Sequence, residues 1–177
     1  MTGLTGTGQL VRVIIRHDRL VLAAWIAVIV VVGVGTVAYY AQLFATPEAR
    51  AALAADVAAT PALLAFNGPL LGDSLDVMAT WRMRDLSYTL ISVMTLMTTI
   101  RHSRAEEDSG RQELVGAAVI GRHAALTASL IVAIAAGVVA ALLVAAGMIG
   151  LGLAPAGALG YAAAASATGA VFAGVGA

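Results

Sequence analysis

The sequence predicts an all-α fold, a polytopic bundle of four transmembrane helices of which the last is truncated. Hydrophobic residues make up 60% of the chain and charged residues 11%, whereas soluble domains carry about 25% charged residues. The mean hydropathy is +0.93, and long apolar runs alternate with short polar segments. We therefore expect one transmembrane domain over residues 1–177, accompanied by an N-terminal interfacial helix and a short cytosolic helix.

The composition also excludes several classes of function. The formal net charge is zero, so the chain has no basic field for nucleic acid. All ten basic residues are arginines and there is no cysteine, which excludes the lysine of a P-loop, a lysine Schiff base, a thiolate nucleophile and a disulfide. No catalytic dyad, metal-ligand cluster or cofactor motif is present in the sequence. We therefore expect neither an enzyme nor a bound cofactor.

Four segments are predicted to cross the membrane, because about 20 apolar residues span a hydrocarbon core of about 30 Å. The second is the least apolar: residues 86–100 make only about 22 Å of helix, so this span must draw in Met83, Arg84 and Asp85 at its outer end. The last run reaches Ala177 without a polar flank, which predicts the N-terminal part of a longer protein. The expected spans are residues 20–44, 82–100, 124–151 and 158–177.

The arginines predict a cytosolic N-terminus, because basic residues are enriched on the cytosolic side of a membrane. This orientation places seven arginines inside and three outside. The inside set is Arg12, Arg16, Arg19, Arg101, Arg104, Arg111 and Arg122, and the outside set is Arg50, Arg82 and Arg84. Residues 45–81 are then extracytoplasmic and residues 101–123 are cytosolic.

Residues 9–19 have the pattern of an amphipathic helix, which would lie in the headgroup layer. Its apolar residues are Leu10, Val13 and Ile14, and its basic residues are Arg12, Arg16 and Arg19. An ordinary basic flank of the first span would give the same pattern, and the sequence leaves this alternative open.

The cytosolic segment 101–123 carries signals for the start of a helix. Ser103 and Glu106 fit a capping box, and the acidic run from Glu106 to Asp108 would complement the helix dipole. Glu107 and Arg111 are spaced four residues apart in the favourable order. A short amphipathic cytosolic helix is therefore predicted, with a solvated loop as the alternative.

The same segment resembles a known family. Its residues follow the pattern E-E-x-G-R-x-E-L-V…G-R, formed by Glu106, Glu107, Gly110, Arg111, Glu113, Leu114, Val115, Gly121 and Arg122. This pattern is similar to the loop between the second and third spans of ATP-binding-cassette (ABC) exporter permeases of the type-2 class, in the actinobacterial branch of polyketide-antibiotic and multidrug exporters. The chain departs from that pattern at residues 118–120, where many relatives have a proline.

The resemblance implies a function for the whole assembly. It implies a permease subunit in a bacterial plasma membrane that exports a hydrophobic or amphipathic, antibiotic-like compound. A separate ABC ATPase subunit would bind the loop helix and supply the energy, and the transporter would be dimeric or pseudo-dimeric. The alternative is a membrane scaffold that transports nothing and whose cytosolic helix recruits a partner protein.

The remaining polar features lie on the outer side and along the second span. Residues 46–48 indicate a helix start, Pro61 interrupts that helix and residues 66–69 are expected to form a turn. This outer segment fits either an external gate or an interfacial hairpin, and the hairpin is favoured. Along the second span the polar residues Arg84, Tyr88, Ser92, Thr95 and Thr99 form one stripe. We expect this stripe to serve helix packing rather than substrate contact, although the pattern fits both. Arg84 and Asp85 would alternatively extend their charged groups to the outer interface of the membrane.

Overall fold

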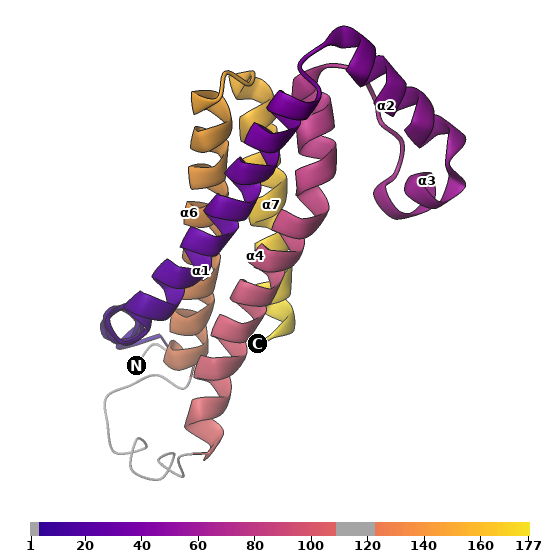
Figure 1. Ribbon diagram of the computed structural model, residues 1–177. Coiled ribbons are helices and arrows are strands. Elements are labelled where there is room, and N and C mark those ends of the chain that lie inside the picture. Colours follow the sequence, from indigo (N-terminus) through magenta and orange to yellow (C-terminus); the bar gives the residue numbers. More distant parts are fainter. Residues whose placement is uncertain (1–3, 109–122) are drawn as a thin grey trace.

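The computed structural model describes residues 4–108 and 123–177, and every regular element in these ranges is a helix. The helices are α1 (Thr7–Leu43), α2 (Pro47–Ala59), α3 (Pro61–Asn67), α4 (Leu75–Asp108), α6 (Ala124–Gly150) and α7 (Pro155–Val175). Figure 1 shows α1, α4, α6 and α7 packed side by side, with α2 and α3 projecting from one end of this bundle. The predicted all-α membrane bundle is confirmed.

Three of the described helices, α1, α6 and α7, are long and apolar enough to cross a membrane. The pair α2 and α3 meets the same criterion only when both are taken together, and the chain bends by 94° between them. The helix α4 does not meet it, because charged residues lie near both of its ends and hydroxyl residues lie between them. It nevertheless packs against α1, α6 and α7 along the bundle, so its polar residues are sheltered by its neighbours.

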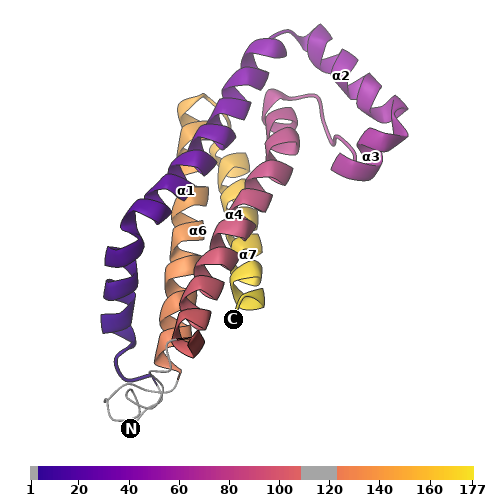
Figure 2. The ribbon, with the colours of Figure 1, turned by 60° about the horizontal axis from the view of Figure 1, so that its bottom comes forward.

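The helix α1 includes both the expected interfacial helix, residues 9–19, and, up to Leu43, the expected first span, residues 20–44, which were predicted as separate elements. It continues without interruption for 37 residues, because no proline or glycine lies between Gln9 and the middle of the apolar run. Its first turns point away from the axis of the remainder (Figure 1), and Figure 2 shows the same end from below the bundle. Of the expected apolar face, Ile14 is buried against the bundle, whereas the side chain of Val13 is 62% exposed.

The helix α4 is continuous from Leu75 to Asp108, so it extends beyond both ends of the expected span of residues 82–100. The Ser74 hydroxyl, just before this helix, accepts a hydrogen bond from the amide of Val77, at 3.4 Å. At the other end, the prediction that Ser103 caps a new helix is wrong, because Ser103 lies inside α4. Its hydroxyl donates to the carbonyl of Ile100 at 3.3 Å, a local bond that serine makes readily within a helix.

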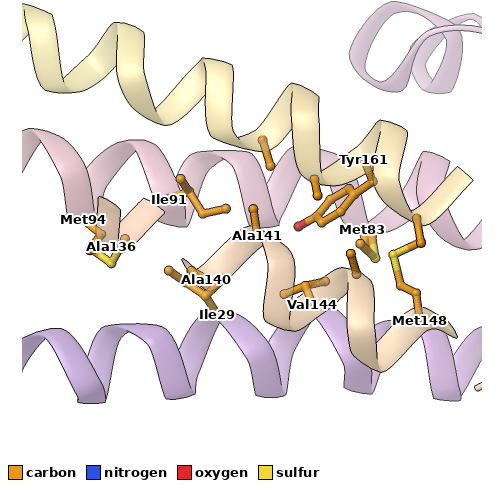
Figure 3. Packing of buried hydrophobic residues seen from close by; sticks show 14 of the residues in the cluster. Ile29, Met83, Ile91, Met94, Ala136, Ala140, Ala141, Val144, Met148 and Tyr161 are labelled. Carbon is orange, nitrogen blue, oxygen red and sulfur yellow. The ribbon is translucent and has the colours of Figure 1, made fainter. Parts of the chain in front are cut away.

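Small residues allow the helices of the bundle to approach closely. Figure 3 shows Ala140 and Ala141 of α6 in the centre of the packed cluster and Ala136 beside Met94 at one end of it. A Cβ added to Gly147 of α6 would lie 2.3 Å from a methyl group of Val34 in α1, so the contact between these two helices requires glycine. The start of α7 is tied to the start of α4 by a hydrogen bond from the Ala154 amide to Asp76 Oδ2, at 3.1 Å.

Candidate functional site

The polar stripe of α4 faces the interior of the bundle over most of its length. Thr95 and Thr99 are completely buried, and Ser92 is 6% exposed. Tyr88, nearer the start of the helix, is partly buried, and the centre of its ring lies 5.5 Å from that of Tyr161 in α7. The structure therefore brings these four stripe residues to one buried side of α4.

The two threonine hydroxyl groups of this stripe are satisfied within their own helix. Thr95 Oγ1 donates to the carbonyl of Ser92 at 3.1 Å, and Thr99 Oγ1 donates to the carbonyl of Thr95 at 3.1 Å. Thr98, on the adjacent side of the helix, donates to the carbonyl of Met94 at 2.7 Å. Such bonds remove the cost of burying a hydroxyl group without a partner.

The methyl group of Thr95 is enclosed by glycines of two other helices. A Cβ added to Gly137 of α6 would lie 3.1 Å from this methyl group, and one added to Gly169 of α7 would lie 3.3 Å from it. The Cβ on Gly169 would also lie 2.8 Å from Ile91. In this structure, the contacts of Thr95 are therefore those of helix packing.

Arg84, the outermost member of the stripe, does not join the buried hydroxyl groups. Its guanidinium donates to the backbone carbonyl of Asn67 at the end of α3, and its Nε donates to Asp85 Oδ1 at 3.2 Å. The neighbouring Trp81 donates its indole N–H to the carbonyl of Gly68 at 3.1 Å. Arg84 and Trp81 thus attach the α2–α3 hairpin to the bundle.

A cluster of ionisable side chains joins α1 to the opposite end of α4. Asp18 is 2% exposed, and its Oδ2 lies 2.5 Å from Nε2 of His102. Its Oδ1 lies 3.4 Å from Nη2 of Arg101, at ion-pair distance, with no hydrogen-bond partner of its own in the described part of the chain. Burying a carboxylate costs free energy unless the carboxylate is paired. Arg101 and His102 therefore offset the cost of packing α1 against α4 at Asp18.

The Asp18–Arg101–His102 cluster was not predicted from the sequence. A local signal existed, because Asp18 lies four residues from both Ile14 and Leu22, and these three residues form the buried face at the start of α1. Because basic residues surround Asp18, residues 9–19 were interpreted as basic throughout, and the single carboxylate was overlooked. The partners are 84 positions away in the sequence, and periodicity within one helix carries no information about such a distance.

Most of the residues that carry the resemblance to exporter permeases lie outside the part of the chain that the structure describes. Glu106 and Glu107 belong to the last turn of α4, and the placement of their side chains is not described. The other residues of this set fall in the undescribed segment 109–122, and they are Gly110, Arg111, Glu113, Leu114 and Arg122. Arg101 and His102, which contact Asp18 of α1, lie in the last turns of α4 before this segment.

The fold and these sites define a class of protein. Three helices are apolar enough to cross a membrane, and a fourth long helix in the same bundle turns its hydroxyl residues inward and is joined to α1 by a buried ionic cluster. Polar residues arranged in this way are typical of proteins whose helices pack against one another within a bilayer. The chain is a multi-pass membrane protein.

Comparison with known proteins narrows this class. No protein-family model matches the chain. The chain is 37% identical, over 177 residues, to a multidrug efflux system permease protein of Mycobacterium tuberculosis (strain ATCC 25618 / H37Rv). The match covers 99% of this chain and 32% of that protein, so the chain spans about a third of the length of its relative. The chain is a homologue of one part of an efflux permease, which confirms the resemblance to exporter permeases.

Proposed function

We propose that this chain is the membrane-embedded part of an ABC exporter permease of the type-2 class, which moves a hydrophobic or amphipathic compound outward and is powered by a separate ATPase subunit. The observation that carries the proposal is the 37% identity to a multidrug efflux permease over 99% of the chain. The exported compound is antibiotic-like, and the complete transporter has two such permease units or two halves of one chain.

The arrangement at the proposed cytosolic end supports this function. The last turns of α4 lead directly into the segment whose residues match the coupling loop, and the same turns contact α1 through Asp18. A movement imposed on the loop by an ATPase would therefore act on α4 and α1 together. Glu106, Glu107, Gly110, Arg111, Glu113, Leu114 and Arg122 are the proposed contacts of the ATPase.

The test uses the full-length permease that contains this segment, purified together with its ATPase subunit and reconstituted in lipid vesicles. Glu113→Arg should reduce substrate-stimulated ATP hydrolysis while membrane insertion is retained, because position 113 lies between the predicted membrane spans and the change leaves their apolar residues intact. Asp56→Arg is the matched control, since Asp56 is exposed on α2 and lies outside the proposed contacts.

The same experiment distinguishes a transporter from a scaffold that recruits a partner. A permease predicts that charge reversal at Glu106, Glu107 or Glu113 weakens coupling and that the unchanged protein moves drug-like compounds out of cells. A scaffold predicts retained partner binding with no transport in any variant. Unchanged co-purification and unchanged ATP hydrolysis in all three variants would remove the assignment of this loop as the coupling element.

A further inference from the structure

A groove lies between the second half of α1 and the first turns of α4. Its volume is about 630 Å³, within the range of roughly 300–1,000 Å³ that is typical of sites for small ligands. One part of its lining is aliphatic and includes Val31, Val32 and Leu86. The other part is polar and aromatic and includes Tyr39, Tyr40, Arg82 and Asp85, whose carboxylate is paired with Arg84.

These two parts of the lining lie at different levels along the helices. Val31 and Tyr40 are nine residues apart in α1, which corresponds to about 14 Å along a helix axis. Arg82 is close enough to Tyr40 to interact electrostatically with its hydroxyl group. The groove therefore has a cation and aromatic rings at one end, and mainly aliphatic side chains, with Thr36, toward the other, while Asp85 lies between Arg82 and Leu86 in sequence.

The positive charge of Arg82 has no counter-ion in the described part of the chain. The carboxylate nearest in sequence, Asp85, is engaged by Arg84 at 3.2 Å, and no carboxylate lies within ion-pair distance of Arg82 among the described residues. Arg82 is exposed and can extend along the mouth of the groove. An arginine in this setting favours an anionic oxygen ligand such as a phosphate group.

The groove is also accessible from the lipid. Only 17% of the most apolar stretch of α1 is buried inside the protein, and the side chain of Val31, which lines the groove, is 70% exposed. In a multi-pass membrane protein, exposed apolar side chains of this kind contact acyl chains. The bilayer can therefore supply the occupant of the groove directly.

We propose that this groove is a specific binding site for a membrane phospholipid with an anionic head group. The phosphate group binds the Arg82 guanidinium and accepts a hydrogen bond from Tyr40, and one acyl chain lies along Val31, Val32 and Leu86. The level of the head group agrees with the enrichment of aromatic residues at the membrane–water interface. The site does not depend on which compound, if any, the protein transports.

The test measures which lipids remain bound to the full-length protein. The protein is reconstituted in vesicles of phosphatidylcholine with a minor share of phosphatidylglycerol, extracted gently, and its bound lipids are counted by mass spectrometry. The unchanged protein should be enriched several-fold in phosphatidylglycerol over the bulk composition, because the phosphate of phosphatidylcholine is compensated by its own ammonium group whereas phosphatidylglycerol has a net negative charge for Arg82 to attract. Arg82→Gln should abolish this enrichment, and Arg82→Lys should retain part of it because the charge remains.

A second variant tests the groove itself. A Cβ added to Gly35, which lines the groove, meets nothing within 4 Å, so Gly35→Leu should fill the groove without disturbing the fold and should also remove the enrichment. Gly160→Leu is the matched control, because Gly160 on α7 is equally open and lies outside the groove.

Three results would each overturn the proposal. Enrichment that survives Arg82→Gln would show that no head group binds this arginine. Enrichment that is lost in Arg82→Gln but kept in Gly35→Leu would place the lipid on the surface rather than in the groove. An equal loss in Gly35→Leu and Gly160→Leu would indicate a general effect on the surrounding lipid.

Discussion

Asp18 places a carboxylate on the inward side of α1, where the neighbouring positions of the same face are Ile14 and Leu22. Breaking a buried ion pair by removing one partner typically costs roughly 3–5 kcal/mol, whereas replacing both partners by apolar residues is often neutral or stabilising. The two partners of Asp18 differ in exposure, since the side chain of His102 is 15% exposed and that of Arg101 is 50% exposed. The contact of Asp18 with His102 should therefore contribute more to stability than its contact with Arg101.

A double-mutant cycle on Asp18 and His102 follows from this asymmetry. His102→Leu should lower the free energy of unfolding by about 3 kcal/mol, the lower end of the range because Arg101 still faces the carboxylate. Asp18→Leu should cost less, because it removes the buried charge, and the double variant should resemble Asp18→Leu rather than the sum of the two changes. Denaturant unfolding in detergent micelles measures all three. A more severe loss in Asp18→Leu than in His102→Leu would contradict this account.

Thr95 provides a second prediction at the residue scale. Its hydroxyl group bonds only within α4, to the carbonyl of Ser92, so Thr95→Val keeps the shape and loses only one local hydrogen bond within the same helix. We expect almost unchanged stability and unchanged export of a fluorescent drug from cells. A folded Thr95→Val variant with reduced export would instead place Thr95 on the substrate pathway.

At the scale of the elements, glycine positions distinguish contacts that need close approach from helix surfaces that do not. Gly169 and Gly160 lie on the same helix, α7, yet a Cβ added to Gly169 would lie 2.8 Å from Ile91, while one added to Gly160 meets nothing within 4 Å. Ile91 is completely buried and has little room to move. The contact between α4 and α7 therefore depends on the absence of a side chain at Gly169.

The matched pair Gly169→Ala and Gly160→Ala tests this dependence. Gly169→Ala should destabilise the bundle by about 1–3 kcal/mol, the usual cost of overpacking a closely packed core. Gly160→Ala should be neutral or stabilising by up to about 1 kcal/mol, because alanine favours the helix more than glycine. Thermal unfolding of both variants in the same detergent gives the comparison. Equal shifts for the two variants would show that α4 and α7 can separate without cost.

Sequence patterns predicted the elements better than the contacts between them. The apolar runs indicated α1, α6 and α7, and the spacing of hydroxyl residues indicated which side of α4 is buried. The single helix from Thr7 to Leu43 and the position of Ser103 within α4 were missed, because propensity does not specify where two adjoining helical segments fuse. The Asp18 cluster was missed because its partners lie on another helix, and only the packing of α1 on α4 brings them together.

At the scale of the whole molecule, the bundle has two chemically different ends. The end that holds Asp18 and His102 also holds the basic start of α1, and the opposite end carries the α2–α3 hairpin, where the apolar side chains of Phe66 and Leu71 are 87% and 86% exposed. Exposed apolar side chains of this kind suit a membrane interface. The excess of arginines at the first end predicts that this end is cytosolic.

Single cysteines test this orientation without background, because the chain has no cysteine. Leu71→Cys on the hairpin end and His17→Cys at the start of α1 both replace exposed side chains, and neither alters the number of arginines that sets the topology. In intact cells a membrane-impermeant maleimide should label Leu71→Cys, while His17→Cys should react only after the membrane is permeabilised. The reverse pattern would invert the topology and place residues 101–123 outside, which would contradict the proposed binding of an ATPase to this segment. Labelling of both cysteines in intact cells would show that α1 does not cross the membrane.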